Sequence, residues 1–302
     1  MRITKTLHGV IPPLMTPLNK EGHIDIQGTR NVIDRCINGG VTGLFILGTM
    51  GEGQTITDAD KEIFIKEAYE YTAGRVPVLV GVSAESYCRV MENVKRAERC
   101  GADYLVVLPP YFSGASCQAD LVNFFTNVAD NASKPVLIYN NPIMTKNALT
   151  FDSFKTLAAH KNIVGVKNSS SDFDFHMKLV REFKEREDFA VFTGVETMCD
   201  NAILTGTDGL VPGLGTLCPE IFVECYKAGV AMDVDKANEI QNTIIDMFDD
   251  IYLTGYWAWQ VGQKYALSVL GVCEKYHSAV TRELSDADKA KIEAALEKYN
   301  IK

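Results

Sequence analysis

Several features of membrane, secreted and nucleic-acid-binding proteins are missing from the sequence. No segment approaches the run of about 18 consecutive apolar residues that a membrane-spanning helix requires. Residues 1–18 lack the uninterrupted apolar core of a secretory signal. The formal net charge of −9 argues against the basic surface typical of proteins that bind nucleic acid or anionic lipid. These absences predict a cytoplasmic protein with no membrane or nucleic-acid partner.

The chain also lacks the spacings that mark disulfide frameworks and metal sites. Its eight cysteines include no C-x-x-C pair, and no Cys/His cluster has the spacing of zinc ligands. The five histidines are scattered and form no spaced pair. We therefore expect reduced thiols that pack mostly as small core side chains, no bound metal and no catalytic histidine.

What the sequence does contain is a series of eight short apolar runs. Their starts lie about one βαβ unit apart, and segments with helical periodicity separate them. This alternation predicts a (β/α)8 barrel, with an open doubly wound sheet as the alternative. The open sheet is disfavoured because no G-x-G-x-x-G follows the first run. The runs cover residues 9–15, 43–48, 76–82, 103–109, 134–139, 162–167, 189–194 and 208–213.

The last part of the chain has a different pattern, with helical segments and no further apolar run of the strand type. The chain has 302 residues, and a single barrel of this kind needs only about 250. We therefore predict a barrel domain over residues 1–228 and a helical C-terminal extension over residues 229–302. The predicted late helices cover residues 219–232, 233–255, 256–272 and 285–299.

A lysine ends the sixth apolar run, and its neighbour on the adjacent run is a tyrosine. Catalytic residues of such barrels lie at the carboxyl ends of the strands. Tyr139 and Lys167 end the fifth and sixth runs and should meet at the same rim. A lysine at a strand end can simply extend its ammonium to water. The alternative is a nucleophilic amine, whose proton transfers a neighbouring phenol can assist.

The second and seventh runs also end in candidate site residues. The turn "GTMGEG" (48–53) follows the second run and contains Thr49. It can be a simple tight turn, a phosphate cradle, or a set of backbone N–H groups that binds a small carboxylate. Glu196 follows the seventh run and can face the mouth of the pocket. Asp172 and Asp174 are expected to cap the next helix or to face solvent.

In this order, "GTMGE" (48–52), "YNNP" (139–142) and "VGVK" (164–167) resemble the dihydrodipicolinate synthase / N-acetylneuraminate lyase family. The resemblance runs from about residue 7 to the end of the chain. It implies a class I aldolase or lyase without metal or organic cofactor. Lys167 would form a Schiff base with pyruvate or a related 2-keto acid, and Tyr139 would be the general acid and base. The turn at Thr49 and Met50 would bind the keto-acid carboxylate. The family is usually a homotetramer whose site borrows an aromatic residue from a neighbouring subunit.

The chain departs from the family pattern on the side of the second substrate. Met144 stands where the synthase has a carboxylate-binding arginine. Phe112, beside Tyr111, stands where the borrowed tyrosine is expected. Gly213 replaces a serine of the sialic acid lyase, and Glu196 matches an acidic residue that meets substrate hydroxyls there. The candidate catalytic residues are Lys167, Tyr139 and Thr49, and the candidate substrate-binding residues are Met50, Gly51, Gly194, Glu196, Phe112, Tyr111, Met144 and Gly213.

These residues predict a retro-aldol cleavage of a 2-keto acid to pyruvate and an aldehyde, or the reverse condensation. Within the same chemistry, the alternatives are 4-hydroxy-tetrahydrodipicolinate synthase and a dehydratase that acts on a keto-deoxy sugar acid. A barrel that binds a keto acid without catalysis is the alternative from another class of protein. The methionines and the phenylalanine at the departing positions predict a short or partly apolar aldehyde in preference to sialic acid.

Overall fold

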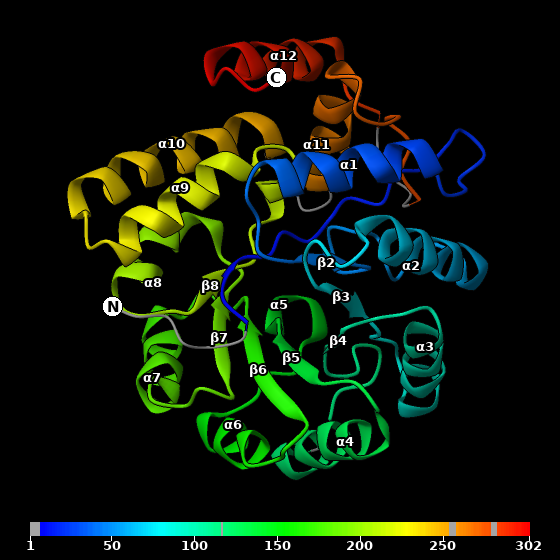
Figure 1. Ribbon diagram of the computed structural model, residues 1–302, viewed down its shortest axis with the longest axis vertical. Coiled ribbons are helices and arrows are strands. Elements are labelled where there is room, and N and C mark those ends of the chain that lie inside the picture. The colour runs from blue at the N-terminus through cyan, green and yellow to red at the C-terminus, as the bar shows by residue number, and fades with distance from the viewer. Residues whose placement is uncertain (1–6, 116, 254–257, 279–282) are drawn as a thin grey trace.

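The structure, a computed structural model, describes residues 7–115, 117–253, 258–278 and 283–302. The described residues contain a sheet of eight strands, and each strand coincides with one of the apolar runs (Figure 1). The strands are β1 (Gly9–Val10), β2 (Leu44–Ile46), β3 (Val78–Gly81), β4 (Tyr104–Val107), β5 (Val136–Asn140), β6 (Ile163–Asn168), β7 (Ala190–Thr193) and β8 (Gly209–Leu210).

The sheet is parallel and closes on itself. The strand order is β1-β8-β7-β6-β5-β4-β3-β2, and every pairing between neighbours is parallel. A parallel bridge between Pro13 and Phe45 joins the two ends of this order. There, the Leu14 amide donates to the Phe45 carbonyl at 2.8 Å. The fold is therefore a (β/α)8 barrel, as the alternation of strands and helices predicted, and not an open sheet.

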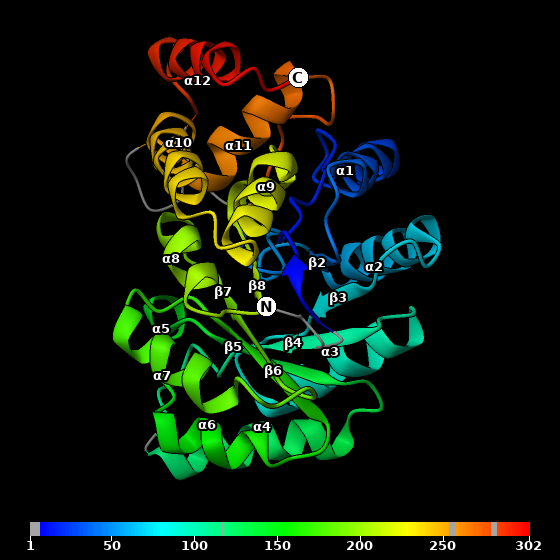
Figure 2. The ribbon, with the colours of Figure 1, turned by 60° about the vertical axis from the view of Figure 1, so that its left-hand side comes forward.

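Helices surround the barrel, and further helices follow it (Figures 1 and 2). Those of the barrel are α1 (Ile26–Asn38), α2 (Asp58–Thr72), α3 (Tyr87–Arg99), α4 (Gln118–Asn131), α5 (Pro142–Thr145), α6 (Phe151–Ala158), α7 (Phe173–Phe183), η1 (Glu196–Met198), α8 (Cys199–Leu204), η2 (Gly213–Thr216) and α9 (Pro219–Val230). The extension consists of α10 (Val234–Tyr252), α11 (Ala258–Val269) and α12 (Asp286–Lys298).

Local sequence explains where several helices begin. The side chain of Thr57 accepts a hydrogen bond from the Asp60 amide and caps α2. Asp172 caps α7 in the same way through the Phe175 amide, which confirms its predicted structural role. Ser285 begins α12 with a reciprocal capping box.

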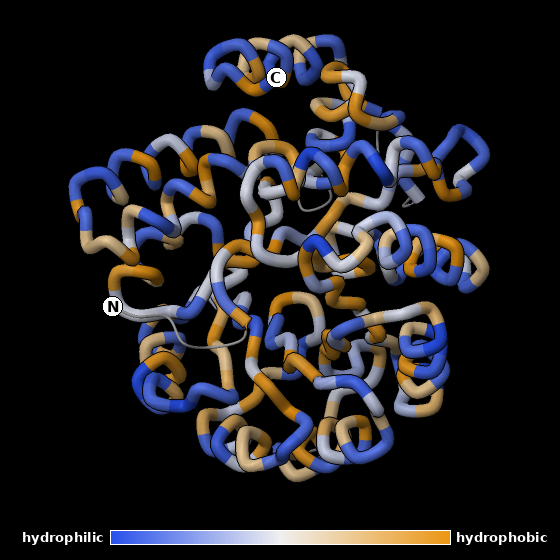
Figure 3. The backbone as a smooth tube through the Cα atoms, viewed as in Figure 1, coloured by the Kyte–Doolittle hydropathy of each residue, from blue (hydrophilic) through white to orange (hydrophobic). Residues whose placement is uncertain are grey.

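Alternate residues of each strand belong to two different cores. Phe45, Leu79 and Leu137 belong to an inner cluster that fills the barrel. Their strand neighbours, such as Ile46 and Ile138, belong to a larger cluster shared with the helices. Because side chains alternate along a strand, each strand is buried on both faces, and this explains the uninterrupted apolar runs. The hydropathy colouring shows this contrast between the strands and the mixed surface of the helices (Figure 3).

The extension stacks at one end of the molecule, where α10 packs along α9 and α11 joins α10 to α12 (Figures 1 and 2). Parts of two predicted helices lie outside the described residues, as do residues 1–6. These parts are the last two residues of the helix predicted over 233–255 and the first two residues of the helix predicted over 256–272. α9 ends just beyond the predicted boundary at 228, and the division into two domains stays a prediction. In the described part of the chain, no helix combines the length and the hydropathy needed to cross a membrane.

Candidate active site

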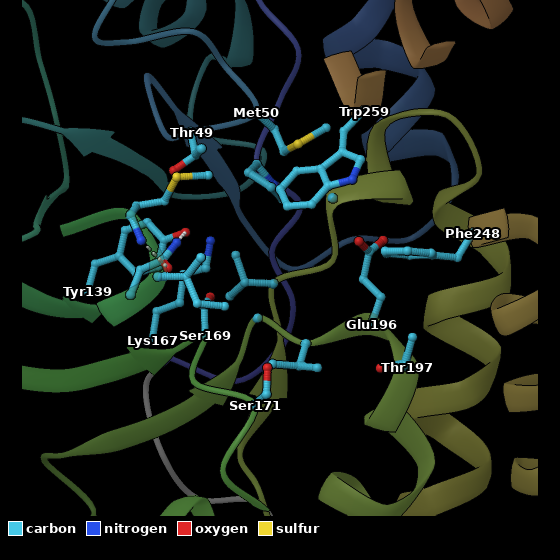
Figure 4. Close-up of a pocket in the computed structure, with 18 of the residues that line it drawn as sticks. Thr49, Met50, Tyr139, Lys167, Ser169, Ser171, Glu196, Thr197, Phe248 and Trp259 are labelled. Carbon is cyan, nitrogen blue, oxygen red and sulfur yellow. Dashed lines mark hydrogen bonds between the residues drawn. The ribbon is translucent and has the colours of Figure 1, made fainter. Parts of the chain in front are cut away.

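A cavity of about 270 Å³ opens at the carboxyl ends of the strands (Figure 4). Its walls come from strand ends of the barrel and from two helices of the extension. The residues that line it are Pro13, Thr49, Met50, Tyr139, Asn141, Ile143, Met144, Lys167, Ser169, Ser171, Gly194, Val195, Glu196, Thr197, Val211, Gly213, Phe248, Tyr252 and Trp259.

Lys167 enters this cavity from β6. Its strand neighbour Val166 packs outward against the helices, so alternation directs Lys167 into the barrel. The lysine is only 4% exposed, and its Nζ lies 4.1 Å from the ring centroid of Tyr139. Gly194 on the neighbouring strand end makes room for it, because a Cβ there would lie 2.7 Å from the Lys167 Cε. The amine is thus enclosed in the barrel and does not extend to bulk water.

Tyr139 pairs directly with Lys167 in the register of β5 and β6, as the two strand ends predicted. Its hydroxyl accepts a hydrogen bond from the Asn141 side-chain Nδ2 at 3.1 Å and also contacts the hydroxyls of Thr49 and Ser169. Burial alone would raise the pKa of this phenol. The Lys167 ammonium and the three polar side chains outweigh burial and lower the pKa of Tyr139 below its ordinary value. A phenol in this setting can give and take a proton beside the amine.

The turn after β2 forms one wall of the cavity. Thr49 and Met50 line the wall, and among the described residues their N–H groups have no protein acceptor. The turn is closed by hydrogen bonds from the Glu52 and Gly53 amides to the carbonyls of Thr49 and Gly48. Adjacent amides with no protein acceptor form the kind of concave donor set that binds a small carboxylate.

The opposite half of the cavity contains a buried carboxyl group. Glu196 begins η1, accepts a hydrogen bond from the Leu214 amide at 2.7 Å, and receives a second from the Tyr252 hydroxyl at 3.3 Å. Burial raises the pKa of Glu196 to about 7, against the lowering effect of these donors. A larger residue in place of Gly213 would displace its neighbours, because an added Cβ would lie 2.4 Å from the Tyr252 hydroxyl.

The extension supplies an aromatic wall next to this carboxyl group. Phe248 and Tyr252 lie one turn apart on α10, with ring centroids separated by 4.8 Å. Trp259, on α11, lies 6.0 Å from Tyr252. Figure 4 shows Phe248 beside Glu196 and Trp259 beside Met50, across the cavity from Tyr139 and Lys167.

The short helix α5 closes the side of the cavity near Tyr139. It presents Ile143 and Met144, both apolar, to the cavity. Of the described residues that line the cavity, Lys167 alone carries a positive charge. The position at which the synthase pattern has an arginine therefore offers no bidentate partner to a second carboxylate.

Three predicted site residues lie outside this cavity. Phe112 is 86% exposed on the loop after β4, and Tyr111 lies beside Glu85. The Asn147 side-chain amide donates to the Pro110 carbonyl of this loop at 2.6 Å. Gly51 belongs to the turn after β2 but does not line the cavity. Phe112 does not line the pocket of a single chain, and its reach into the site of a neighbouring copy stays a prediction.

Sequence reasoning missed several residues of the site. Ser169 and Ser171 follow Lys167 directly in "NSSS", and that cluster of hydroxyls after a strand end was the available signal. Thr197 follows Glu196 in the same way. Phe248, Tyr252 and Trp259 carry no such signal, because an aromatic residue in an amphipathic helix is usually a core residue.

The histidines and cysteines have structural surroundings. His176 is fully buried on α7 and lies 2.8 Å from the Thr207 hydroxyl, and burial lowers its pKa to about 4. All eight cysteines are free thiols, and five of them are buried. Within the described ranges, no three His, Cys, Asp or Glu side chains are grouped so that they could hold a metal ion.

Comparison with known proteins agrees with this geometry. The profile of the dihydrodipicolinate synthetase family matches residues 6–299. The chain belongs to the dihydrodipicolinate synthetase family. It is accordingly a lyase of the class I, pyruvate-type aldolase kind.

Members with different names are about equally similar to the chain. The 4-hydroxy-tetrahydrodipicolinate synthase of Neisseria meningitidis serogroup B is 30% identical over 96% of this chain and 98% of the relative. The putative 2-dehydro-3-deoxy-D-gluconate aldolase YagE of Escherichia coli K12 is 33% identical, and the match covers 79% of this chain and 80% of the YagE chain. Overall similarity therefore does not choose between synthase and aldolase.

Two solved structures support the same fold. Dihydrodipicolinate synthase of Bacteroides thetaiotaomicron superposes with a TM-score of 0.92 at 31% identity, over 99% of this chain and 100% of that one. YagE of Escherichia coli K12, solved in complex with pyruvate, gives a TM-score of 0.90 at 28% identity, over 98% and 100% of the two chains.

Proposed function

We propose that the protein cleaves a short hydroxylated 2-keto acid into pyruvate and an aldehyde, or catalyses the reverse condensation, through an imine on Lys167. The observation that carries the proposal is the enclosed Lys167 amine, 4.1 Å from the ring of Tyr139, in a cavity that provides no second positive charge. The pyruvate complex of YagE supports the keto-acid half.

The reaction follows from the positions of the two side chains. The unprotonated Lys167 amine attacks the keto carbon, and Tyr139 passes protons while water leaves and the imine forms. A base then removes the proton of the 4-hydroxyl group, the C3–C4 bond breaks, and the aldehyde departs. The electron pair of that bond is held as an enamine, which takes a proton at C3. Hydrolysis of the resulting imine releases pyruvate and restores the lysine.

The keto-acid carboxylate is held at the turn after β2. The N–H groups of Thr49 and Met50 supply two donors, and the Thr49 hydroxyl adds a third group beside Tyr139. A substrate bound there would direct its keto carbon toward Lys167 and its aldehyde half toward Glu196, because these two residues lie on opposite sides of the cavity (Figure 4). Thr49 would then both position the carboxylate and help to set the phenol.

The far half of the cavity supports an aldehyde with a few hydroxyl groups. Ser171, Thr197 and Glu196 offer polar partners, whereas the side chains of Ile143, Met144 and Phe248 do not. Aspartate semialdehyde carries a carboxylate and an ammonium group, and this half provides no cation for that carboxylate. Condensation with aspartate semialdehyde is therefore expected to be poor, and a rapid synthase reaction would contradict the proposal.

We further expect a homotetramer in the cytoplasm that needs no metal or organic cofactor. In such an assembly the exposed Phe112 is available to a neighbouring copy. Analytical ultracentrifugation would establish the assembly state, and activity that persists after treatment with EDTA would support the absence of a metal requirement.

Trapping of the imine tests the proposal directly. Incubation with pyruvate and sodium borohydride should add a reduced three-carbon group, which peptide mass spectrometry would place on Lys167. Trapping without pyruvate is the control. An adduct on another lysine, or none at millimolar pyruvate, would sink the mechanism. A barrel that only binds keto acids would show saturable pyruvate binding without an adduct.

A further inference from the structure

One face of α11 reaches into the two loops that shape the cavity. Gln260 donates through Nε2 to the Thr49 carbonyl at 3.0 Å, and Gln263 donates to the Gly213 carbonyl at 3.0 Å. Lys264, beside Gln263, pairs with Glu52 at 2.5 Å. These three side chains have the spacing of one helix face, and each meets a loop that lines the cavity or lies next to it.

The Glu52 carboxylate is almost completely enclosed. One oxygen pairs with the Lys264 Nζ, and both side chains are at most 1% exposed. The other oxygen accepts hydrogen bonds from the Ser278 amide at 2.6 Å and the Ser278 hydroxyl at 2.7 Å. Lys264 also donates to the Tyr276 carbonyl at 2.6 Å. The C-terminal extension therefore contacts the turn after β2 through this carboxylate from two sides, with the ion pair from Lys264 and the hydrogen bonds from Ser278.

Glu52 has a backbone conformation that a non-glycine residue rarely adopts. Its φ is +55°, in the left-handed region that favours glycine, although Gly51 and Gly53 flank it. A buried ion pair is in general no more stabilising than apolar side chains of the same volume. Neither the backbone conformation nor a gain in stability therefore explains why a glutamate stands at this position. A requirement for its carboxylate group does explain it.

We propose that Lys264 and Gln260 are positioning residues that hold the turn at Thr49 and Met50 in the geometry that binds the keto-acid carboxylate. Glu52 transmits the restraint, because it lies in the same turn and its amide bonds to the Thr49 carbonyl. This inference rests on the proposed function, since it concerns the affinity for pyruvate. It makes the extension a working part of the keto-acid site and not only a cover over the barrel.

The test compares pyruvate binding in variants that keep or remove the contacts of Lys264 and Gln260 with the turn after β2. In the double variant Glu52→Gln/Lys264→Met both charges are removed together, so that no lone charge stays buried. Its melting temperature should remain near that of the wild type. The pyruvate concentration that gives half-maximal borohydride trapping should rise about tenfold, as expected when a hydrogen bond to a carboxylate is misplaced. The KM for the aldehyde in the condensation direction should change less than about twofold.

Two further variants keep the test decisive. Gln260→Leu removes only the hydrogen bond to the Thr49 carbonyl and should raise the half-saturating pyruvate concentration about threefold. Lys298→Met is the matched control, because it breaks an ion pair with Asp250 on the same extension, away from the cavity. It should leave pyruvate trapping unchanged.

Each outcome bears on one proposal. Normal pyruvate half-saturation in a folded double variant, or in Gln260→Leu if the double variant does not fold, would overturn the positioning role. An equal rise of the half-saturating pyruvate concentration in Lys298→Met would show that any destabilisation of the extension weakens pyruvate binding. That result would also overturn the positioning role. A wild-type enzyme that traps no pyruvate would refute the proposed imine chemistry itself.

Discussion

The two halves of the cavity are built in different ways. The half around Lys167 and Tyr139 consists of adjacent ends of paired strands, with Thr49 on the turn of a third strand. The half around Glu196 combines a strand end with aromatic side chains from α10 and α11 of the extension. Figure 4 shows the two groups facing each other across the cavity.

This difference in construction bears on which half of the cavity sets the reaction and which half selects the aldehyde. Strand register fixes Tyr139 beside Lys167, so the relative position of these two side chains tolerates little variation. The far half depends on helices that follow the barrel, and side chains there can change without disturbing the strand pairing. We therefore infer that the near half sets the reaction and that the far half sets the aldehyde.

The largest expected effect comes from removing the imine centre. Lys167→Ala should lower kcat/KM on the order of 10⁴-fold or more, because no other group can form the covalent intermediate. Steady-state cleavage of a 4-hydroxy-2-keto acid measures this. Lys161→Ala, which changes an exposed lysine just before the same strand, is the control and should retain activity. Substantial turnover by Lys167→Ala would break the distinction between the halves.

Exclusion of a second carboxylate should give the next largest effect. In the condensation direction with pyruvate, kcat/KM for aspartate semialdehyde should be at least about 100-fold below that for glyceraldehyde, since no guanidinium is placed to donate hydrogen bonds to its carboxylate. A coupled assay with both aldehydes measures the ratio. Met144→Arg should bring the two kcat/KM values closer together by raising the value for aspartate semialdehyde without raising the value for glyceraldehyde. Efficient wild-type use of aspartate semialdehyde would show that another basic residue performs this role.

The length and polarity of the aldehyde half offer a test of similar or smaller size. A short hydroxylated chain meets Ser171, Thr197 and Glu196, whereas a longer chain reaches the apolar ring of Phe248, which offers its hydroxyls no partner. Shorter 4-hydroxy-2-keto acids should therefore exceed N-acetylneuraminate by at least about 100-fold in kcat/KM for cleavage. Equal cleavage of N-acetylneuraminate would show that this half is more polar than the side chains suggest.

The smallest expected effect is a pH dependence that belongs to the far half alone. The pKa of Glu196 is about 7, so its carboxyl ionises as the pH rises through neutrality. The ionised form accepts a substrate hydroxyl more strongly, and the KM for the hydroxylated substrate should fall by about tenfold at most. Glu196→Gln should remove this dependence and leave half-saturation by pyruvate unchanged. A pH profile that survives the substitution would assign the titration elsewhere.

The same carboxyl group predicts how stability changes with pH. The folded-state pKa of Glu196 lies above its ordinary value of 4.5, so the folded protein holds this proton more tightly than the unfolded chain. The contribution to stability is complete below pH 4.5 and is lost as the pH rises through about 7. Chemical denaturation at several pH values should show a shallower decline over this window for Glu196→Gln than for the wild type.

The sequence carried enough information for the barrel and for the pairing of Tyr139 with Lys167. Apolar runs buried on both faces identified the strands, and the rule that parallel strand ends share one rim placed Tyr139 beside Lys167. Both inferences depend on local patterns and on a repeated connection, so distant contacts do not alter them. The same logic explains why Asp172 was identified as a helix cap from its place before α7.

Only the tertiary structure decided what surrounds that centre. It turned Phe112 outward, brought Phe248, Tyr252 and Trp259 across the cavity, and paired Lys264 with Glu52. These contacts join segments far apart in the sequence, and helix periodicity states only that one face is buried, not what it is buried against. The sequence by itself therefore determined the fold and the place of Lys167 beside Tyr139. Packing of the extension against the barrel decided the shape and polarity of the aldehyde half.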